Sequence, residues 1–291
     1  MKLHRQTWEP DSRPKAVVML LHGLGEHIVR YAAVAAALAR ARFVVTGFDL
    51  RGHGRSGGRR GHTSSYAVLL EDIDALLARV RSDYPRSPIF LYGHSLGGAL
   101  AINYVLRRSP IIKGVIATAP WLRAVVQAPP WKVVVARVVE PILPIYTQKW
   151  RQGPTDLSRD PAVMSAAQHD PLMHDFITAR MYRVATEAGA YALEHAAEFP
   201  LPLLLMHGTE DKLTSWQASR VFAQHAGRRC TFRLWEGWYH ELHNEAGKAT
   251  IVRTMVNWMN RRLKPASSSR ASSGQIRRGM RKSRPLRRDR S

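Results

Sequence analysis

The sequence is poor in cysteine, in long apolar runs and in acidic residues. Its 291 residues contain a single cysteine, Cys230, which excludes an internal disulfide and is typical of a reducing compartment. No apolar run approaches the roughly 18 residues that a membrane span requires. The first residues, 1–9, lack the apolar core of a secretory signal. Together these absences predict a cytoplasmic location.

Acidic residues are half as numerous as basic ones. Asp and Glu number 22 against 44 Lys and Arg, which gives a formal net charge of +22. Nine basic residues and one acidic residue lie within 265–291, so the rest of the chain is basic as well. Basic surfaces attract anionic partners such as phospholipid headgroups or nucleic acid. An arginine-rich composition without any binding role explains the same charge equally well.

The chain also lacks a metal-binding histidine signature such as H-E-x-x-H, so a metal-dependent enzyme is not expected. Hydrophobic residues make up 45% of the chain and charged residues 23%, as in ordinary soluble globular proteins. A chain of this length can bury a large core, either as one α/β domain or as a domain that carries an insertion.

The most informative motif is G-x-S-x-G at residues 93–97. It follows an apolar strand pattern at 88–92 and precedes a helical pattern at 96–106 that begins with small residues. Between a strand and a helix, this motif places its serine on a sharp, strained turn with the hydroxyl exposed above the sheet. The flanking glycines allow the helix to pack closely on the strand. The context therefore predicts that Ser95 is a nucleophile rather than part of an ordinary turn.

Strand and helix patterns alternate along much of the chain. Strands are expected over 15–21, 43–49, 88–92, 111–119, 202–206 and 230–235. Helices are expected over 31–41, 66–84, 96–106, 174–188, 215–225 and 246–263. Because the strands are almost continuously apolar, they predict a doubly wound, mainly parallel α/β sheet flanked by helices. Cys230 begins the last strand, so its thiol is expected to be buried.

The alternation stops between residues 121 and 199, where tryptophans and prolines gather. We interpret this segment as an inserted, mostly helical cap over the carboxyl edge of the sheet. Residues 1–120 and 200–264 then form the core, and the Ser-, Gly- and Arg-rich residues 265–291 form a disordered basic tail. The very apolar stretches 125–139 and 141–145 suit an acyl chain or a lipid interface, or they simply pack the cap onto the core.

A nucleophilic serine needs a base, and the base needs a third group that orients it. In the predicted fold the chain order is Ser, then Asp or Glu, then His, each on a loop after a strand. Asp211 follows the strand at 202–206 and His240 follows the strand at 230–235, so they are the predicted acid and base. His94 and His207 are expected to be structural. The weaker candidates are His243 for the base, and Glu210, Asp170 and Asp175 for the acid.

The chemistry also requires an oxyanion hole, formed by backbone N–H groups that point at the developing negative charge. The residue after the nucleophile, Leu96, supplies one of them. The glycine-rich loop 22–25 follows an early strand and supplies the other, which we predict to be the N–H of Leu24.

With these residues in place, the chain resembles the monoacylglycerol lipase and lysophospholipase group of α/β-hydrolases. The resemblance is carried by LHGLGEH (21–27) with the Arg30-Tyr31 pair, FDLRGHGRSGGRRGH (48–62), GHSLGG (93–98), HGTEDKLT (207–214) and YHELHNE (239–245). It implies the α/β-hydrolase fold and a serine esterase that cleaves monoacylglycerol or a similar single-chain lipid ester through an acyl-enzyme, without a cofactor. It also implies that Glu26, Arg30 and His243 lie near the glycerol end of the site. An ion pair between Glu26 and Arg30 that braces the oxyanion loop is an equal alternative.

Other functions stay open on the same scaffold. A lysophospholipase, a general carboxylesterase or, with less support, a peptidase would use the same residues. A non-catalytic lipid- or nucleic-acid-binding module would keep the fold, but the complete Ser, Asp and His set argues against it. The tail 265–291 suits peripheral association with an anionic membrane, its lack of aromatic residues argues against nucleic acid, and an extension without function is at least as well supported. Nothing in the sequence specifies an oligomeric state.

Overall fold

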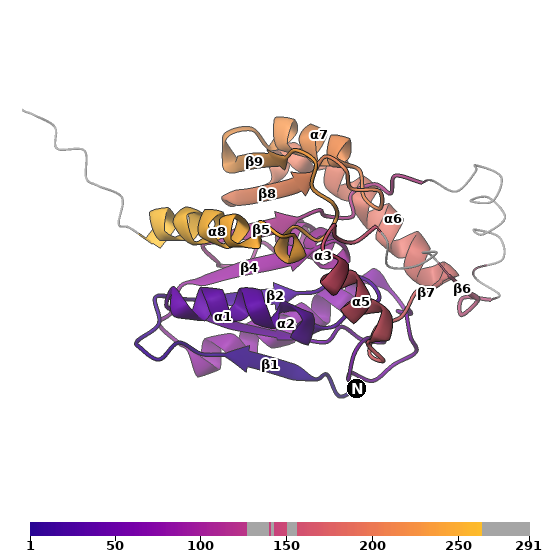
Figure 1. The fold of residues 1–291 in the computed structure, drawn as a ribbon, viewed down its shortest axis with the longest axis horizontal. Coiled ribbons are helices and arrows are strands. Elements are labelled where there is room, and N and C mark those ends of the chain that lie inside the picture. Colours follow the sequence, from indigo (N-terminus) through magenta and orange to yellow (C-terminus); the bar gives the residue numbers. More distant parts are fainter. Residues whose placement is uncertain (127–139, 141–142, 150–155, 264–291) are drawn as a thin grey trace, which may run out of the picture.

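The computed structural model describes residues 1–126, 140, 143–149 and 156–263 (Figure 1). At its centre is a seven-stranded sheet with the strand order β1-β3-β2-β4-β5-β8-β9. The strands are β1 (Arg5–Trp8), β2 (Ala16–Leu21), β3 (Phe43–Phe48), β4 (Ile89–His94), β5 (Gly114–Thr118), β8 (Leu203–Gly208) and β9 (Cys230–Trp235). All neighbouring strands pair in parallel except β1, which pairs antiparallel with β3. The predicted mainly parallel sheet is confirmed.

Helices cover both faces of this sheet (Figure 1). They are α1 (Ala32–Arg40), α2 (Tyr66–Asp83), α3 (Leu96–Arg108), α7 (Trp216–Ala226) and α8 (Lys248–Leu263). Successive strand residues point to opposite faces, so Val17 belongs to the apolar cluster that includes side chains of α2, α3 and α7, whereas Val18 belongs to the cluster that includes side chains of α1 and α8. The described residues also form four short 3₁₀ helices: Ile28–Tyr31, Ala196–Glu198, Gly227–Arg229 and Leu242–Asn244.

Between β5 and β8 the chain leaves the central sheet. It forms β6 (Thr147–Lys149), α5 (Pro161–His169), β7 (Phe176–Thr178) and α6 (Ala179–Glu194). The helix expected over 174–188 begins only at Ala179, because the preceding residues pair with β6 and the hydroxyl of Thr178 caps the helix. These elements fall in the segment for which the sequence predicts a cap, and the bounds of that cap stay a prediction. Most of the apolar stretches 125–139 and 141–145, and the tail 265–291, lie outside the described residues.

The two edge strands depart from the sequence-based expectations. The strand β1 has no apolar run, since all four of its residues are only partly buried, and the patterns do not predict it. The other edge strand, β9, is also partly exposed. Cys230 is therefore only partly buried, whereas the sequence predicts a buried thiol. Within the described part of the chain, no helix is both long and apolar enough to cross a membrane.

The parallel strands bring their carboxyl ends to one edge of the sheet. Ligands of open α/β sheets bind in the crevice outside this edge. The loop 22–27 follows β2, Ser95 follows β4, Asp211 follows β8, and His240 follows β9. All four parts of the predicted site therefore lie at the same edge.

Candidate active site

Ser95 lies on the turn between β4 and α3. Its backbone has φ 54° and ψ −117°, a conformation that residues other than glycine rarely adopt. The turn is possible because the residues two positions before and after Ser95, Gly93 and Gly97, lack side chains. A Cβ on Gly93 would lie 2.1 Å from the carbonyl oxygen of Gly97, and a Cβ on Gly97 would lie 2.2 Å from that of Leu21. The close approach of α3 to the sheet holds Ser95 in this strained position, as its motif predicts.

Asp211 and His240 are in direct contact. The distance between Nδ1 of His240 and Oδ2 of Asp211 is 2.7 Å, and both side chains are buried. The backbone N–H groups of Leu213 and Thr214 donate to Oδ1 of Asp211, and the Thr214 hydroxyl donates to Oδ2. Burial would raise the pKa of Asp211, but the charge of His240 and a hydrogen bond from His207 hold that pKa well below its usual range. Asp211 is therefore an ionised, fixed acceptor for the imidazole.

This contact sets the protonation of the His240 ring. A carboxylate can only accept hydrogen bonds, so Nδ1 carries a proton and Nε2 is left to accept one. Burial would lower the pKa of His240, but the charge of Asp211 and its hydrogen bond raise that pKa above the ordinary value. The ring lies 4.7 Å from the ring of His94, the residue that precedes Ser95. The geometry suits a general base placed next to the nucleophile turn.

The other histidines of this region have different surroundings. His243 is fully buried and stacks on Tyr31 at 4.4 Å, and neither ring nitrogen has a hydrogen-bond partner among the described residues. Burial lowers its pKa to about 3, so this ring is neutral. His207 contacts Asp211 at 2.9 Å through Nε2 and Ser219 at 2.8 Å through Nδ1. His207 thus supports the loop of the acid, as expected.

The alternative acids contact other residues or are exposed. Asp170 contacts Nε2 of His27 at 2.7 Å, and Asp175 lies 3.4 Å from Lys149. Glu210 is exposed. The candidate acid in contact with His240 is Asp211.

The loop after β2 approaches the nucleophile closely. A Cβ on Gly23 would lie 3.1 Å from Cβ of Ser95 and 2.7 Å from Oε1 of Glu26. Leu96 is the first residue of α3, so its N–H has no partner within the helix. The N-terminal end of the helix dipole adds positive potential at the same point. The helix start and the loop that holds Leu24 therefore lie next to Ser95, and their use as an oxyanion hole stays a prediction.

Glu26 and Arg30 form an ion pair, and Glu241 completes a buried cluster with them. Nη1 of Arg30 lies 2.8 Å from Oε2 of Glu26, and its two terminal nitrogens lie 2.6 and 2.8 Å from the two carboxylate oxygens of Glu241. Oε1 of Glu26 accepts the backbone N–H of Gly23 and the hydroxyl of Tyr31. Arg30 therefore ties the loop of the predicted oxyanion hole to the residue that follows His240. These are the contacts that the bracing alternative requires, whereas a substrate-binding role of Glu26, Arg30 and His243 stays a prediction.

The Glu26–Arg30–Glu241 cluster is charged although it is buried. The side chains of Glu26, Arg30 and Glu241 are 4%, 9% and 2% exposed. Burial would raise the pKa of both carboxyl groups, but Arg30 holds each below its usual range. Two carboxylates against one guanidinium leave a net negative charge beside His240, and this charge contributes to the raised pKa of the base. A buried negative charge at this place stabilises the imidazolium that forms when a base takes a proton.

Sequence reasoning did not identify Glu241. It lies within the YHELHNE block, but its partner Arg30 is 211 positions away in the chain. The one available signal is an acidic residue directly after the predicted base. Among the residues that the structure describes, no group of three or more His, Cys, Asp or Glu side chains is arranged to hold a metal ion.

Comparison with known proteins identifies the family of the chain. Residues 12–247 match the family described as "Serine aminopeptidase, S33". The chain is 32% identical over 254 residues to a monoacylglycerol lipase of Mycolicibacterium smegmatis, which covers 87% of this chain and 90% of that protein. It is 34% identical over 274 residues to an uncharacterized abhydrolase domain-containing protein of Dictyostelium discoideum, covering 93% of this chain but 29% of that protein.

A solved structure shows the same fold. The crystal structure of the monoacylglycerol lipase of Paleococcus ferrophilus matches with a TM-score of 0.82 and 32% identity, covering 90% of this chain and 100% of that chain. The chain therefore belongs to the Serine aminopeptidase, S33 family, with the α/β-hydrolase fold, and is a serine hydrolase of its lipase and esterase group.

Proposed function

We propose that the protein hydrolyses monoacylglycerol to a fatty acid and glycerol, with Ser95 as nucleophile, His240 as base and Asp211 as the group that orients the base. The observation that carries this proposal is the 2.7 Å contact between Nδ1 of His240 and Asp211 at the sheet edge that also holds the strained Ser95 turn. A nucleophile, a base and an orienting carboxylate in this order form the working unit of serine acyl transfer.

The reaction proceeds in two halves. Oγ of Ser95 attacks the ester carbonyl carbon while Nε2 of His240 takes the hydroxyl proton. The tetrahedral intermediate collapses, its bond to the glycerol oxygen breaks, and His240 gives its proton to that oxygen, so glycerol leaves as a neutral alcohol. Water then attacks the acyl-enzyme in the same way, which releases the fatty acid and regenerates the free hydroxyl of Ser95.

Each charge that develops has a partner in the site. The N–H groups of Leu24 and Leu96 hold the oxyanion, and the loss of one such donor typically raises the barrier by roughly 3–4 kcal/mol. The negative charges of Asp211 and of the Glu26–Arg30–Glu241 cluster stabilise the imidazolium form of His240. Arg30 and Glu26 act through the oxyanion loop, while the unpartnered ring nitrogens of His243 are suited to bind a glycerol hydroxyl through an ordered water.

Apolar side chains beside the site support a lipid substrate. Val125 and Val126 are 47% and 81% exposed, and the N–H of Val125 donates to the carbonyl of Leu213 in the loop that holds Asp211. Further exposed apolar side chains in the same part of the chain are Leu143, Ile145, Tyr146 and Phe176. Such side chains next to a catalytic edge suit an acyl chain. Two of the proteins compared above, from Mycolicibacterium smegmatis and Paleococcus ferrophilus, are monoacylglycerol lipases, which supports monoacylglycerol as the ester.

The test compares purified protein on a monoacylglycerol, a lysophospholipid with the same acyl chain, and a short acyl ester. We expect kcat/KM to be highest for the monoacylglycerol and hydrolysis of all three to be lost in Ser95→Ala. The matched control is Ser165→Ala, an exposed serine on α5, which should keep wild-type rates. A preference for the lysophospholipid would replace the proposed substrate. Hydrolysis within a few-fold of wild type in Ser95→Ala would contradict the mechanism.

A further inference from the structure

Three hydrogen-bond donors converge on one carboxylate oxygen of Asp211. Nδ1 of His240 lies 2.7 Å from Oδ2, Nε2 of His207 lies 2.9 Å from it, and the hydroxyl of Thr214 lies 2.8 Å from it. All four side chains are buried. The proposed base therefore shares this oxygen with a second histidine.

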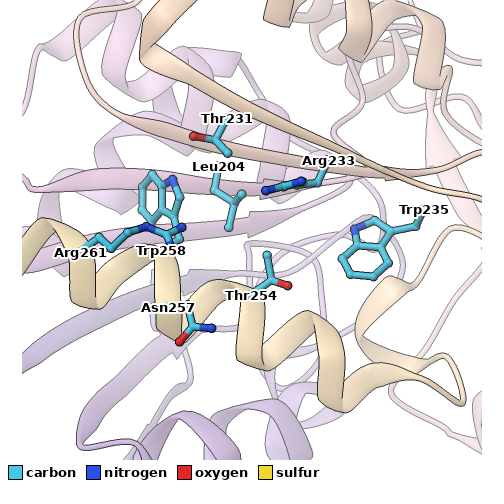
Figure 2. A pocket seen from close by; sticks show the side chains of 8 residues that line it. All are labelled: Leu204, Thr231, Arg233, Trp235, Thr254, Asn257, Trp258 and Arg261. Carbon is cyan, nitrogen blue, oxygen red and sulfur yellow. The ribbon is translucent and has the colours of Figure 1, made fainter.

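The strand β8 and the helix α7 hold His207 in this place. Leu204 of β8 lines a cavity of about 250 Å³ between β9 and α8 (Figure 2). Because side chains alternate along a strand, His207, three positions later, points to the opposite face, against which α7 packs. There the hydroxyl of Ser219, a fully buried residue of α7, lies 2.8 Å from Nδ1 of His207.

These contacts determine which nitrogen of His207 carries the proton. Nε2 faces the carboxylate of Asp211 and, at 3.1 Å, the carbonyl oxygen of Thr214, and both groups only accept hydrogen bonds. Nε2 is therefore the N–H donor, and in the neutral ring Nδ1 accepts a hydrogen bond from the hydroxyl of Ser219. His207 thus presents a donor of fixed orientation to the same oxygen that His240 contacts.

The other charges near His240 are negative. Titratable side chains that interact with it are Asp211, Glu26, Glu241, His94 and His243. The three carboxylates raise the pKa of His240, and a base whose pKa is too high is already protonated at neutral pH and cannot take the serine proton. A hydrogen bond donated to Oδ2 of Asp211 stabilises that carboxylate without any help from the imidazolium, so it acts against this rise.

We propose that His207 is a positioning residue that keeps His240 available as a base, because it donates to the carboxylate oxygen of Asp211 that His240 contacts. The inference rests on the proposed function of Ser95, Asp211 and His240 and adds a fourth residue to that unit. His207 is fully buried and acts only through Asp211. Its effect opposes that of Glu241, whose charge favours the protonated form of His240.

Two variants of His207 separate this role from a structural one. In His207→Gln the amide nitrogen reaches the position of Nε2 and keeps the donor to Asp211, whereas in His207→Asn the shorter side chain reaches only the position of Nδ1. The acid limb of kcat/KM for a short acyl ester should move to higher pH by roughly half a pH unit or more in His207→Asn. It should stay near its wild-type position in His207→Gln. The matched control is His225→Asn, an exposed histidine on α7, which should change neither the limb nor the rate.

A purely structural role of His207 predicts a different result, because it lowers the rate at every pH and leaves the limb in place. Equal limbs in His207→Asn and His207→Gln, or a limb at lower pH in His207→Asn, would overturn the inference and leave the proposed function intact. Wild-type protein that hydrolyses no ester would overturn both. Far-UV spectra check that the variants fold. If His207→Asn does not fold, nitrogen NMR of wild-type protein with labelled histidine decides: the proton of His207 should lie on Nε2, and a proton on Nδ1 alone would overturn the inference.

Discussion

Replacing Arg30 by methionine tests the Glu26–Arg30–Glu241 cluster through stability. Methionine keeps much of the volume of the side chain but leaves two buried carboxylates without a counter-ion. Removing one partner of a buried ion pair typically costs about 3–5 kcal/mol, and here both Glu26 and Glu241 lose their partner, so we expect a loss in free energy of unfolding at the upper end of that range. The measurement is urea-induced unfolding at neutral pH.

Two further variants provide reference values for this loss in free energy of unfolding. Glu241→Gln keeps the shape of the side chain and leaves the 2.8 Å pair of Arg30 with Glu26, so it removes one charge-assisted contact, which contributes about 1.5–3 kcal/mol. Arg79→Gln removes a pair in which the arginine is 65% exposed, and it should cost about 0.5 kcal/mol or less. A smaller loss in Arg30→Met than in Glu241→Gln would refute the assignment of Arg30 as the shared counter-ion of the two carboxylates.

The remaining predictions concern the catalytic residues and the turn. Asp211→Asn should lower kcat by about 10⁴-fold in steady-state ester hydrolysis, because an amide does not favour the required tautomer of His240. Because the pKa of His240 is raised above its ordinary value of 6.5, the acid limb of kcat/KM should lie above pH 6.5, and activity should fall as pH drops through it. Glu241→Gln removes a nearby negative charge and should move this limb to lower pH, whereas the exposed Glu236→Gln should not. Gly97→Ala would place a Cβ 2.2 Å from a backbone carbonyl of β2, so it should yield little folded protein, measured as the soluble fraction on expression.

The buried strands can be predicted from the sequence, because a strand that is buried on both faces consists almost entirely of apolar residues. Every residue of Ala16–Leu21 is buried, and so its apolar run predicts a central strand to within one residue. The edge strand Arg5–Trp8 is only partly buried and carries polar side chains, which leaves no such run. Phe176–Thr178 is a strand only because it pairs with β6, and this pairing moves the start of α6 to Ala179. Tertiary contacts of this kind have no local signal.

The candidate site likewise has residues that the sequence predicts and contacts that it does not predict. Ser95, Asp211 and His240 can be located from the sequence, because each follows a strand that the sequence predicts and the fold fixes which strand ends meet. Arg30 and Glu241 are 211 positions apart in the chain, so no sequence motif predicts their contact.

The proposed mechanism depends on one chemical property, the nucleophilicity of the Ser95 hydroxyl. The direct measurement is labelling of the native protein with a fluorophosphonate, followed by mass spectrometry of the intact chain and of its peptides. We expect one adduct per chain, located on Ser95, with none in Ser95→Ala, a strongly slowed reaction in His240→Ala, and full labelling in Ser165→Ala. An adduct on a different residue, or no labelling of the folded wild-type protein, would contradict the assignment of Ser95 as the nucleophile.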